Sequence, residues 1–363
     1  MEDLDLTPRR FSLYPIEKDQ WSFRRGDGTD VDPNSVVPFE IGEGAFVEDV
    51  SGQFRADEFE IYNEQIGIRR IQPLKRIKYA LVHRFPSYGR DIETGKLLLE
   101  TELTFKSRKL VYELAACLRL IRPVSQYAQF CEGRITDDGR FYDVAFNTPL
   151  EDVFAPINQR QFRVRKEDLV ALRTYAPLFR KAMSGPYWKF RMAAQMHEAG
   201  HFQNTEWKAR YFLWTAALES LYTTQTREHM GSFVAKERIK YLLGADTPVY
   251  PPGDLLSFVP DPRLTVADVL DDIYCLRNNI AHGDKVPDYY AEHEGRPDFE
   301  GDKLTRMDTL MEAISFLVRY SLLTIMGGAL LEHFKDAASS EAYFGRLGLT
   351  KTMLGKRTKK PCP

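Results

Sequence analysis

The stretch TVADVLDDIYCLRNNIAHG, residues 265–283, decides the fold of the second half of this chain. Its apolar residues stand at positions 266, 269, 270, 273, 276 and 280, which is the three-and-four spacing of an amphipathic helix. Gly283 follows as a C-terminal cap, and Pro287 prevents the helix from continuing. The stretch therefore predicts a packed helix that carries a permanent cation, Arg277, and an imidazole, His282, in its last turns.

The rest of the second half repeats this amphipathic pattern. Long runs with helical spacing begin after Pro156, and Ser184-Gly185-Pro186 separates the first two of them. The runs cover residues 166–183, 187–201, 205–224, 228–243 and 302–334, with a charged loop at 293–301. Several such helices joined by short connections predict a helical bundle.

The first 150 residues have a different pattern, in which short apolar or alternating runs are separated by turn residues. The predicted strands cover residues 10–14, 21–24, 37–47, 58–62, 77–83, 97–105, 127–135 and 141–146. A helix is predicted at 107–120, and Asp137-Asp138-Gly139 is typical of a hairpin turn between the last two strands. We therefore expect an α+β protein: a β-rich domain over residues 1–160, a helical bundle over 161–350, and a basic, disordered tail over 351–363.

Composition limits the class of protein. The chain has 363 residues and a net charge of −2, which fits a globular protein with any nucleic-acid contact confined to a local site. Its four cysteines show no paired spacing, so they suggest neither a disulfide framework nor a cysteine zinc site. The N-terminus lacks the apolar run of a signal peptide, and the uncharged run at 320–331 is too short to span a bilayer. We expect a cytoplasmic protein with no membrane partner.

Three helical segments together resemble a known family. Residues 216–222, 233–243 and 276–283 are similar to the HEPN superfamily, particularly its Apea-like branch, over roughly residues 187–335. The resemblance implies a helical bundle that cleaves RNA without a metal or cofactor, as a toxin or antiviral defence effector. Arg277, Asn278 and His282 match the family motif residue by residue, whereas the tyrosine that some branches carry two residues after the histidine is replaced by Asp284. Because many HEPN proteins only bind RNA or nucleotide, a catalytically inactive module is the alternative.

The residue types suit RNA cleavage on physical grounds as well. RNA carries its own nucleophile, the ribose 2′-hydroxyl, so cleavage needs proton transfer and a cation against the charge that develops on the phosphate. Arg277 is the expected cation and His282 the expected proton donor or acceptor. Asn278 lies four residues before His282 on the same helix face, so its amide is expected to orient the imidazole.

Helical geometry constrains this site. Five residues at about 100° each place Arg277 and His282 about 140° apart around the helix and about 7.5 Å apart along it. A complete site then needs either an unwound last turn at Ala281-His282 or a second copy of the helix across a two-fold axis. We therefore predict a homodimer through these helices, with RNA as the partner and a β-rich domain that senses a trigger.

Three further residues, Glu219, Arg238 and Asn279, are predicted to support the site. Glu219 lies on the otherwise apolar face of the 205–224 helix, and a partly buried carboxylate needs a partner, which Arg277 or Arg238 could provide. A positioning role is favoured over chemistry for Glu219, with an exposed helical glutamate as the alternative. Asn279, beside Asn278, is assigned to the same supporting group.

A second motif competes with this interpretation. His197-Glu198-Ala199-Gly200-His201 has the spacing at which two histidines on one helix face bind zinc, with Glu198 as the base and Glu219 as a possible third ligand. Gly200 weakens the helix by about 1 kcal/mol relative to alanine, which places His201 on a fraying turn. We expect the two histidines to be surface residues and a zinc peptidase to be the less favoured function.

Overall fold

The chain forms two compact units, one made of residues 1–153 and 163–176 and the other of residues 154–162 and 177–363. The computed structural model describes residues 7–18, 23–24, 30–31, 36–54, 77–90, 94–95, 97–122, 130–146, 164–202, 206–224, 232–249, 264–297 and 303–354. The last of these divisions falls inside helix α4 (Lys166–Ser184), between Ala176 and Pro177. The predicted α+β class is confirmed, with a sheet in the first unit and helices in the second.

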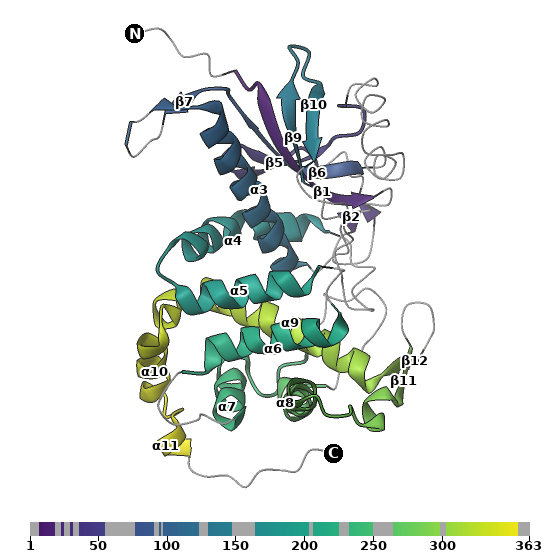
Figure 1. Ribbon diagram of the computed structural model, residues 1–363, viewed down its shortest axis with the longest axis vertical. Coiled ribbons are helices and arrows are strands. Elements are labelled where there is room, and N and C mark those ends of the chain that lie inside the picture. The colour runs from purple at the N-terminus through teal and green to yellow at the C-terminus, as the bar shows by residue number, and fades with distance from the viewer. Residues whose placement is uncertain are drawn as a thin grey trace. The chain divides into compact units, whose positions relative to one another are not determined.

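A six-stranded antiparallel sheet organises the N-terminal unit (Figure 1). Its order is β10-β9-β1-β6-β5-β4. The strands are β1 (Arg10–Lys18), β4 (Phe39–Gly42), β5 (Ala45–Asp49), β6 (Ile77–Phe85), β9 (Cys131–Ile135) and β10 (Phe141–Phe146). Two short pairs add to it, β2 (Phe23–Arg24) with β3 (Asp30–Val31) and β7 (Gly89–Arg90) with β8 (Leu97–Leu98). Because strand side chains alternate between faces, Phe11, Leu13, Val82 and Phe141 gather in one buried cluster.

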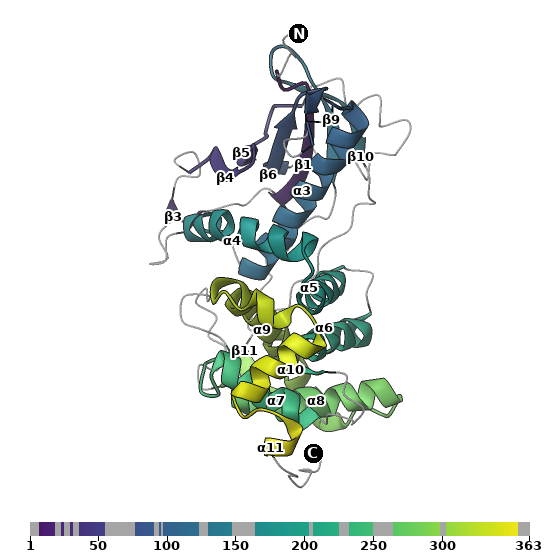
Figure 2. The same cartoon turned by 90° about the vertical axis from the view of Figure 1, so that its left-hand side faces the viewer.

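Helix α3 (Glu100–Ile121) packs on the opposite face of the sheet, against β1 and β6 (Figure 2). Polar contacts hold it there: Ser107 Oγ lies 2.8 Å from His83 Nδ1, and Arg119 donates to the Tyr14 hydroxyl at 2.8 Å. Just after the helix, Arg122 forms a buried, two-pronged ion pair with Asp168 of α4, at 3.0 and 3.1 Å. These contacts fix α3 along its length.

In the described part of the second unit, six helices of ten or more residues lie wholly within the unit. They are α5 (Trp188–Gly200), α6 (Trp207–Tyr222), α7 (Ser232–Leu243), α8 (Val266–His282), α9 (Arg306–Gly327) and α10 (Ala337–Arg346), with shorter pieces η4 (Asp288–Ala291), η5 (Leu331–Phe334) and α11 (Lys351–Leu354). Helix α9 contacts α5, α6, α7 and α8 (Figure 1). Buried hydroxyls connect the layers: Tyr222 donates to Ser321 Oγ at 2.7 Å, and Tyr211 donates to the carbonyl of Ile273 at 3.2 Å.

Several element predictions are wrong in detail. Residues 37–47 form two strands, because Glu43 and Gly44 adopt positive φ values of 54° and 74° and turn the chain between β4 and β5. Residues 97–105 are mostly helix, since Glu102 accepts from the Leu99 amide at 3.0 Å and starts α3 at Glu100.

Two further segments, predicted as a loop and as a disordered tail, contain regular secondary structure. In the expected loop, β11 (His293–Pro297) pairs with β12 (Lys303–Thr305). Residues 351–354 of the tail form α11, so the prediction of disorder is wrong for them. The predicted strand at 58–62 and tail residues 355–363 lie outside the described residues.

Helix α9 is long and apolar enough to cross a membrane. It contains most of the uncharged run at 320–331, and its 22 residues exceed that run in length. However, 78% of its most apolar window is buried inside the protein, as expected for the core helix of a bundle. Its apolar character is therefore explained by packing.

Candidate active site

Helix α8 forms as the sequence predicts. The apolar residues at 266, 269, 270, 273 and 276 are buried, and Ile280 is half-buried. Thr265 and Asp268 form a reciprocal capping box at its start. At its end Gly283 adopts φ 70°, and the amides of Gly283 and Asp284 donate to carbonyls of the last turn. The helix stays regular through His282, so the alternative of an unwound last turn is wrong.

Arg277 is held by an ion pair with Glu219 of α6. Its Nη2 lies 2.9 Å from Glu219 Oε2, and the two side chains are only 24% and 27% exposed. Of the two arginines proposed as partners of Glu219, the structure thus selects Arg277. A carboxylate at this distance limits the orientations that the guanidinium can adopt, and the positioning role of Glu219 stays a prediction.

Two other groups contact the guanidinium of Arg277. Nη1 donates to Asn278 Oδ1 at 3.2 Å, and the guanidinium carbon lies 5.6 Å from the centre of the Phe212 ring. The Nε atom is buried and has no hydrogen-bond partner among the described residues. Buried donors are almost always satisfied in folded proteins, so a water molecule or a ligand can satisfy this one. Phe212 itself is 40% exposed.

The sequence reasoning missed Phe212 and Tyr274. Tyr274 is buried beside the ion pair: burial raises its pKa, the charge of Glu219 raises it further, and Arg277 acts in the opposite direction. Helical spacing could have identified both residues. Tyr274 stands three residues before Arg277, and Phe212 stands seven residues before Glu219, so each shares a helix face with a site residue.

His282 stands apart from this group. Its side chain is exposed, and it makes no hydrogen bond, ion pair or ring contact within the described residues. The expected hydrogen bond between Asn278 and His282 is not formed, and the Asn278 oxygen accepts from Arg277. Asn279 contributes its backbone carbonyl to the helix end, where it accepts from Asp284 at 2.9 Å. One copy of the chain therefore holds Arg277, Asn278 and Glu219 together and leaves His282 in solvent.

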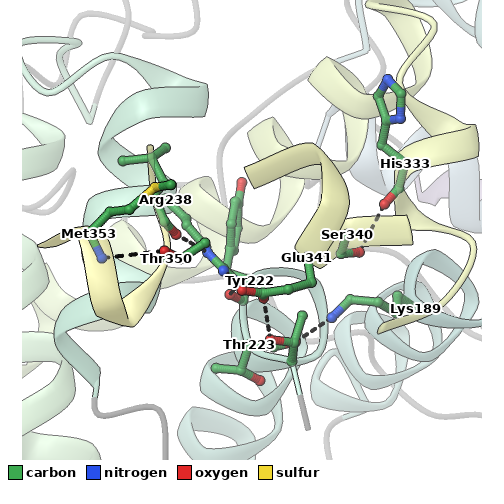
Figure 3. Close-up of polar contacts among 11 residues, drawn as sticks. Lys189, Tyr222, Thr223, Arg238, His333, Ser340, Glu341, Thr350 and Met353 are labelled. Atoms are coloured by element: carbon green, nitrogen blue, oxygen red, sulfur yellow. Dashed lines mark hydrogen bonds and ion pairs between the residues drawn. The ribbon is translucent and has the colours of Figure 1, made fainter. Parts of the chain in front are cut away.

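Arg238 belongs to a different cluster (Figure 3). Its fully buried guanidinium donates to Glu341 Oε2 at 2.8 Å, to the carbonyl of Tyr222 at 3.0 Å and to the carbonyl of Leu349 at 2.9 Å. The prediction that Arg238 supports the Arg277 site is therefore corrected: Arg238 joins α7 to the end of α6 and to α10. Cations favour this position because the last carbonyls of a helix lack partners and carry partial negative charge.

Lys189 completes the Arg238 cluster. Its ammonium group donates to the carbonyl of Thr223, next to the Arg238 contact (Figure 3). Burial, together with the positive charge of Arg238, lowers the pKa of Lys189 to about 8. Burial opposes the ionisation of Glu341, but hydrogen bonds from Thr224 and Arg238 hold its pKa below the ordinary value. The cluster is thus two buried cations balanced by one carboxylate and three carbonyls, which is a structural role.

The paired histidines of α5 do not match their prediction as surface residues. His197 and His201 are 1% and 2% exposed, and their Nε2 atoms lie 3.1 Å apart. The ring of Trp214 packs beside both of them, and its Nε1 donates to the His197 carbonyl at 3.0 Å. Across the described residues, no three His, Cys, Asp or Glu side chains gather in a metal-binding arrangement, and Glu219 bonds Arg277.

Gly200 is explained by the same tryptophan, and it yields a prediction. A Cβ atom at Gly200 would lie 2.3 Å from Trp214 Nε1, so Gly200→Ala forces α5 and α6 apart. We expect the unfolding free energy to fall by about 1–3 kcal/mol, measured by urea denaturation, despite the better helix propensity of alanine.

Gly345→Ala is the matched control for that substitution. Its added Cβ meets only Thr350 Cγ2, at 3.8 Å, so the control should be neutral or slightly stabilising. Equal stability of the Gly200→Ala protein and wild type would contradict the packing described here.

The cysteines differ from expectation at one position. Cys117 and Cys131 are buried free thiols, and burial raises the pKa of each. Cys275, on α8, is disulfide-bonded. The spacing of the cysteines along the sequence did not predict this bond.

The candidate site is thus an oriented arginine on α8, with an unpaired Nε donor and a neighbouring exposed aromatic ring, and a free imidazole at the end of the same helix. Phosphate recognition by a guanidinium and proton transfer by an imidazole are the two chemical steps that these groups can perform. Comparison with protein families, with curated proteins and with solved structures finds no match for this chain.

Proposed function

We propose that this protein is a metal-independent endoribonuclease of the HEPN kind that acts as a homodimer. The observation that carries the proposal is the set of contacts around the Arg277 side chain. Glu219 orients its guanidinium, its Nε lacks a partner, and the same helix ends in an exposed histidine. The resemblance of three helical segments to the HEPN superfamily supports the same function.

The chemistry needs only these groups and the RNA. The ribose 2′-oxygen attacks phosphorus as its proton leaves, a 2′,3′-cyclic phosphate forms, and the 5′-oxygen of the next nucleotide leaves with a proton. Arg277 binds the non-bridging oxygens, on which charge accumulates in the pentavalent transition state. His282 transfers the proton, because an imidazole can act as acid or base near neutral pH. Asn278 and Glu219 position Arg277.

A second copy of the chain supplies what one copy lacks. The regular geometry of α8 keeps Arg277 and His282 about 140° apart around the helix axis, and Glu219 draws Arg277 toward α6. A two-fold contact between α8 helices would bring Arg277 of one protomer to His282 of the other, twice in each dimer. The homodimer is therefore part of the proposed mechanism.

Phe212 gives this site a means to hold RNA in a chain that is not basic overall. Its partly exposed ring lies beside the guanidinium of Arg277. Stacking of a base on an aromatic ring contributes about 1–3 kcal/mol and tolerates any base. We propose that Phe212 stacks a base next to the cleaved phosphate. By analogy with the HEPN superfamily, the protein would be a cytoplasmic toxin or antiviral effector whose N-terminal unit senses a trigger.

The proposal is tested with purified full-length protein and a fluorescent single-stranded RNA in excess EDTA. We expect cleavage to persist in EDTA and to leave 2′,3′-cyclic phosphate ends. A matched oligonucleotide with a 2′-deoxyribose at the cleaved position should resist cleavage there, since it lacks the nucleophile.

Two other outcomes of this experiment would support different functions. RNA binding without cleavage would support the inactive HEPN module. Activity that disappears with EDTA and returns with zinc would contradict the metal-independent mechanism and favour the His197 and His201 motif.

A further inference from the structure

A cavity of about 530 Å³ opens in the N-terminal unit, outside the proposed nuclease site. It lies where β1 begins, β9 ends and α3 starts, and its lining includes Arg9, Arg10, Arg134, Glu100 and Tyr142. Its volume is within the range of pockets that bind small molecules. Three arginines against two carboxylates, Glu100 and Asp137, give the lining an excess of positive charge.

Two of the arginines face each other in the sheet. Arg10 of β1 pairs directly with Arg134 of β9, and Arg134 pairs in turn with Tyr142 of β10. Directly opposed residues of antiparallel strands project from the same face, so the two cations and the aromatic ring form one row. Like charges at opposed positions destabilise a sheet. Such a row is favourable when an anion lies between the cations.

The present partners of these arginines are solvent-exposed carboxylates. Arg10 Nη1 lies 2.7 Å from Glu100 Oε1, and Arg134 Nε lies 3.4 Å from Asp143 Oδ2. The carboxylate side chains are 40% and 60% exposed, and ion pairs in solvent contribute little. Arg10 is only 16% exposed, and its Nε is buried with no hydrogen-bond partner. A half-buried guanidinium that pairs with an exposed carboxylate can exchange that carboxylate for a ligand.

Local backbone geometry adds to the site. Glu100 is the first residue of α3, a helix of 22 residues whose N-terminus carries partial positive charge. A bulge follows Tyr142, where Asp143 has φ 52°. The bulge requires glycine opposite it, because a Cβ at Gly133 would lie 2.8 Å from the Tyr142 carbonyl oxygen. Bulges of this kind commonly direct side chains near binding sites.

We propose that this cavity binds a phosphate-bearing small molecule. Arg10 and Arg134 contact the phosphate with their guanidinium groups, whose fork matches phosphate oxygens. Tyr142, at the end of the row, packs against the remainder of the ligand. The assignment is independent of the nuclease site, because all of these residues belong to the N-terminal unit.

The test is calorimetric titration of the full-length protein with adenosine 5′-monophosphate, inorganic phosphate and adenosine. We expect saturable binding of at least one phosphate-containing probe and weaker binding of adenosine. Tighter binding of the monophosphate than of phosphate would identify a nucleotide, and equal binding would identify phosphate itself. The proposal is overturned if neither phosphate-containing probe binds, or if adenosine binds as tightly as its monophosphate.

Variants of the arginines that line the cavity test whether the ligand binds there. Arg10→Gln and Arg134→Gln should each raise the Kd at least tenfold. Arg140→Gln should change it less than twofold, since Arg140 lies in the neighbouring hairpin turn and does not line the cavity. Arg134 is 49% exposed, so its variant keeps the test valid if Arg10→Gln fails to fold. An unchanged Kd in a folded Arg134→Gln protein would overturn the assignment.

Discussion

Replacing His282 with alanine is expected to lower the rate constant of RNA cleavage by at least about 100-fold, as loss of a general acid or base does. Because the His282 side chain is exposed and makes no hydrogen bond, ion pair or ring contact within the described residues, the melting temperature should not change. Single-turnover cleavage of RNA at saturating protein separates this loss of chemistry from weaker binding.

His333→Ala is the matched control for the His282 variant. His333 is also a partly exposed histidine of the helical unit, but it stacks on Tyr343 near α10. Its removal should leave the rate within about twofold of wild type, since it is not part of the proposed chemistry. Equal rates for His282→Ala and wild type would contradict the role of His282.

The largest stability effect is expected at Arg238. Arg238→Met removes three hydrogen bonds and leaves Glu341 and two carbonyls without their cation, so the unfolding free energy should fall by about 3–5 kcal/mol. For a unit of this size, the melting temperature would fall by on the order of 10 °C. Thermal denaturation followed by circular dichroism measures the change.

Two controls interpret the Arg238 result. Arg346→Met should change stability by less than about 0.5 kcal/mol, because Arg346 makes no hydrogen bond or ion pair to another described residue. The double variant Arg238→Met with Glu341→Leu should recover part of the loss, since it no longer leaves the Glu341 carboxylate without its arginine. A single variant as stable as wild type would show that the cluster does not hold α7 and α10 to α6.

The sequence was sufficient for features that local rules decide. The start and end of α8 follow from Thr265, Asp268 and Gly283, which act within one helical turn, and the hairpin of β9 and β10 follows from its turn residues. The helix α3 was predicted too short because Leu97 to Phe105 has apolar residues that also suit a strand. The capping contact of Glu102 favours the helix over the strand in this segment.

Features that depend on tertiary contacts could not be read from one sequence. The burial of His197 and His201 depends on Trp214, which another helix supplies, and Gly200 has its role only in that contact. The Glu219 pairing was narrowed to two arginines, and only packing selects Arg277. The same limit applied to Asn278, which was predicted to orient His282 and instead accepts a hydrogen bond from Arg277.

Mixing two inactive variants tests the central claim that the site is shared between protomers. In a dimer of Arg277→Ala with His282→Ala, one site lacks both groups and the other keeps both. Random exchange makes half of the dimers mixed, so the mixture should recover about one quarter of the wild-type activity. Native mass spectrometry confirms that mixed dimers form. A mixture with mixed dimers but no more activity than the separate variants would contradict a site shared between two copies of α8.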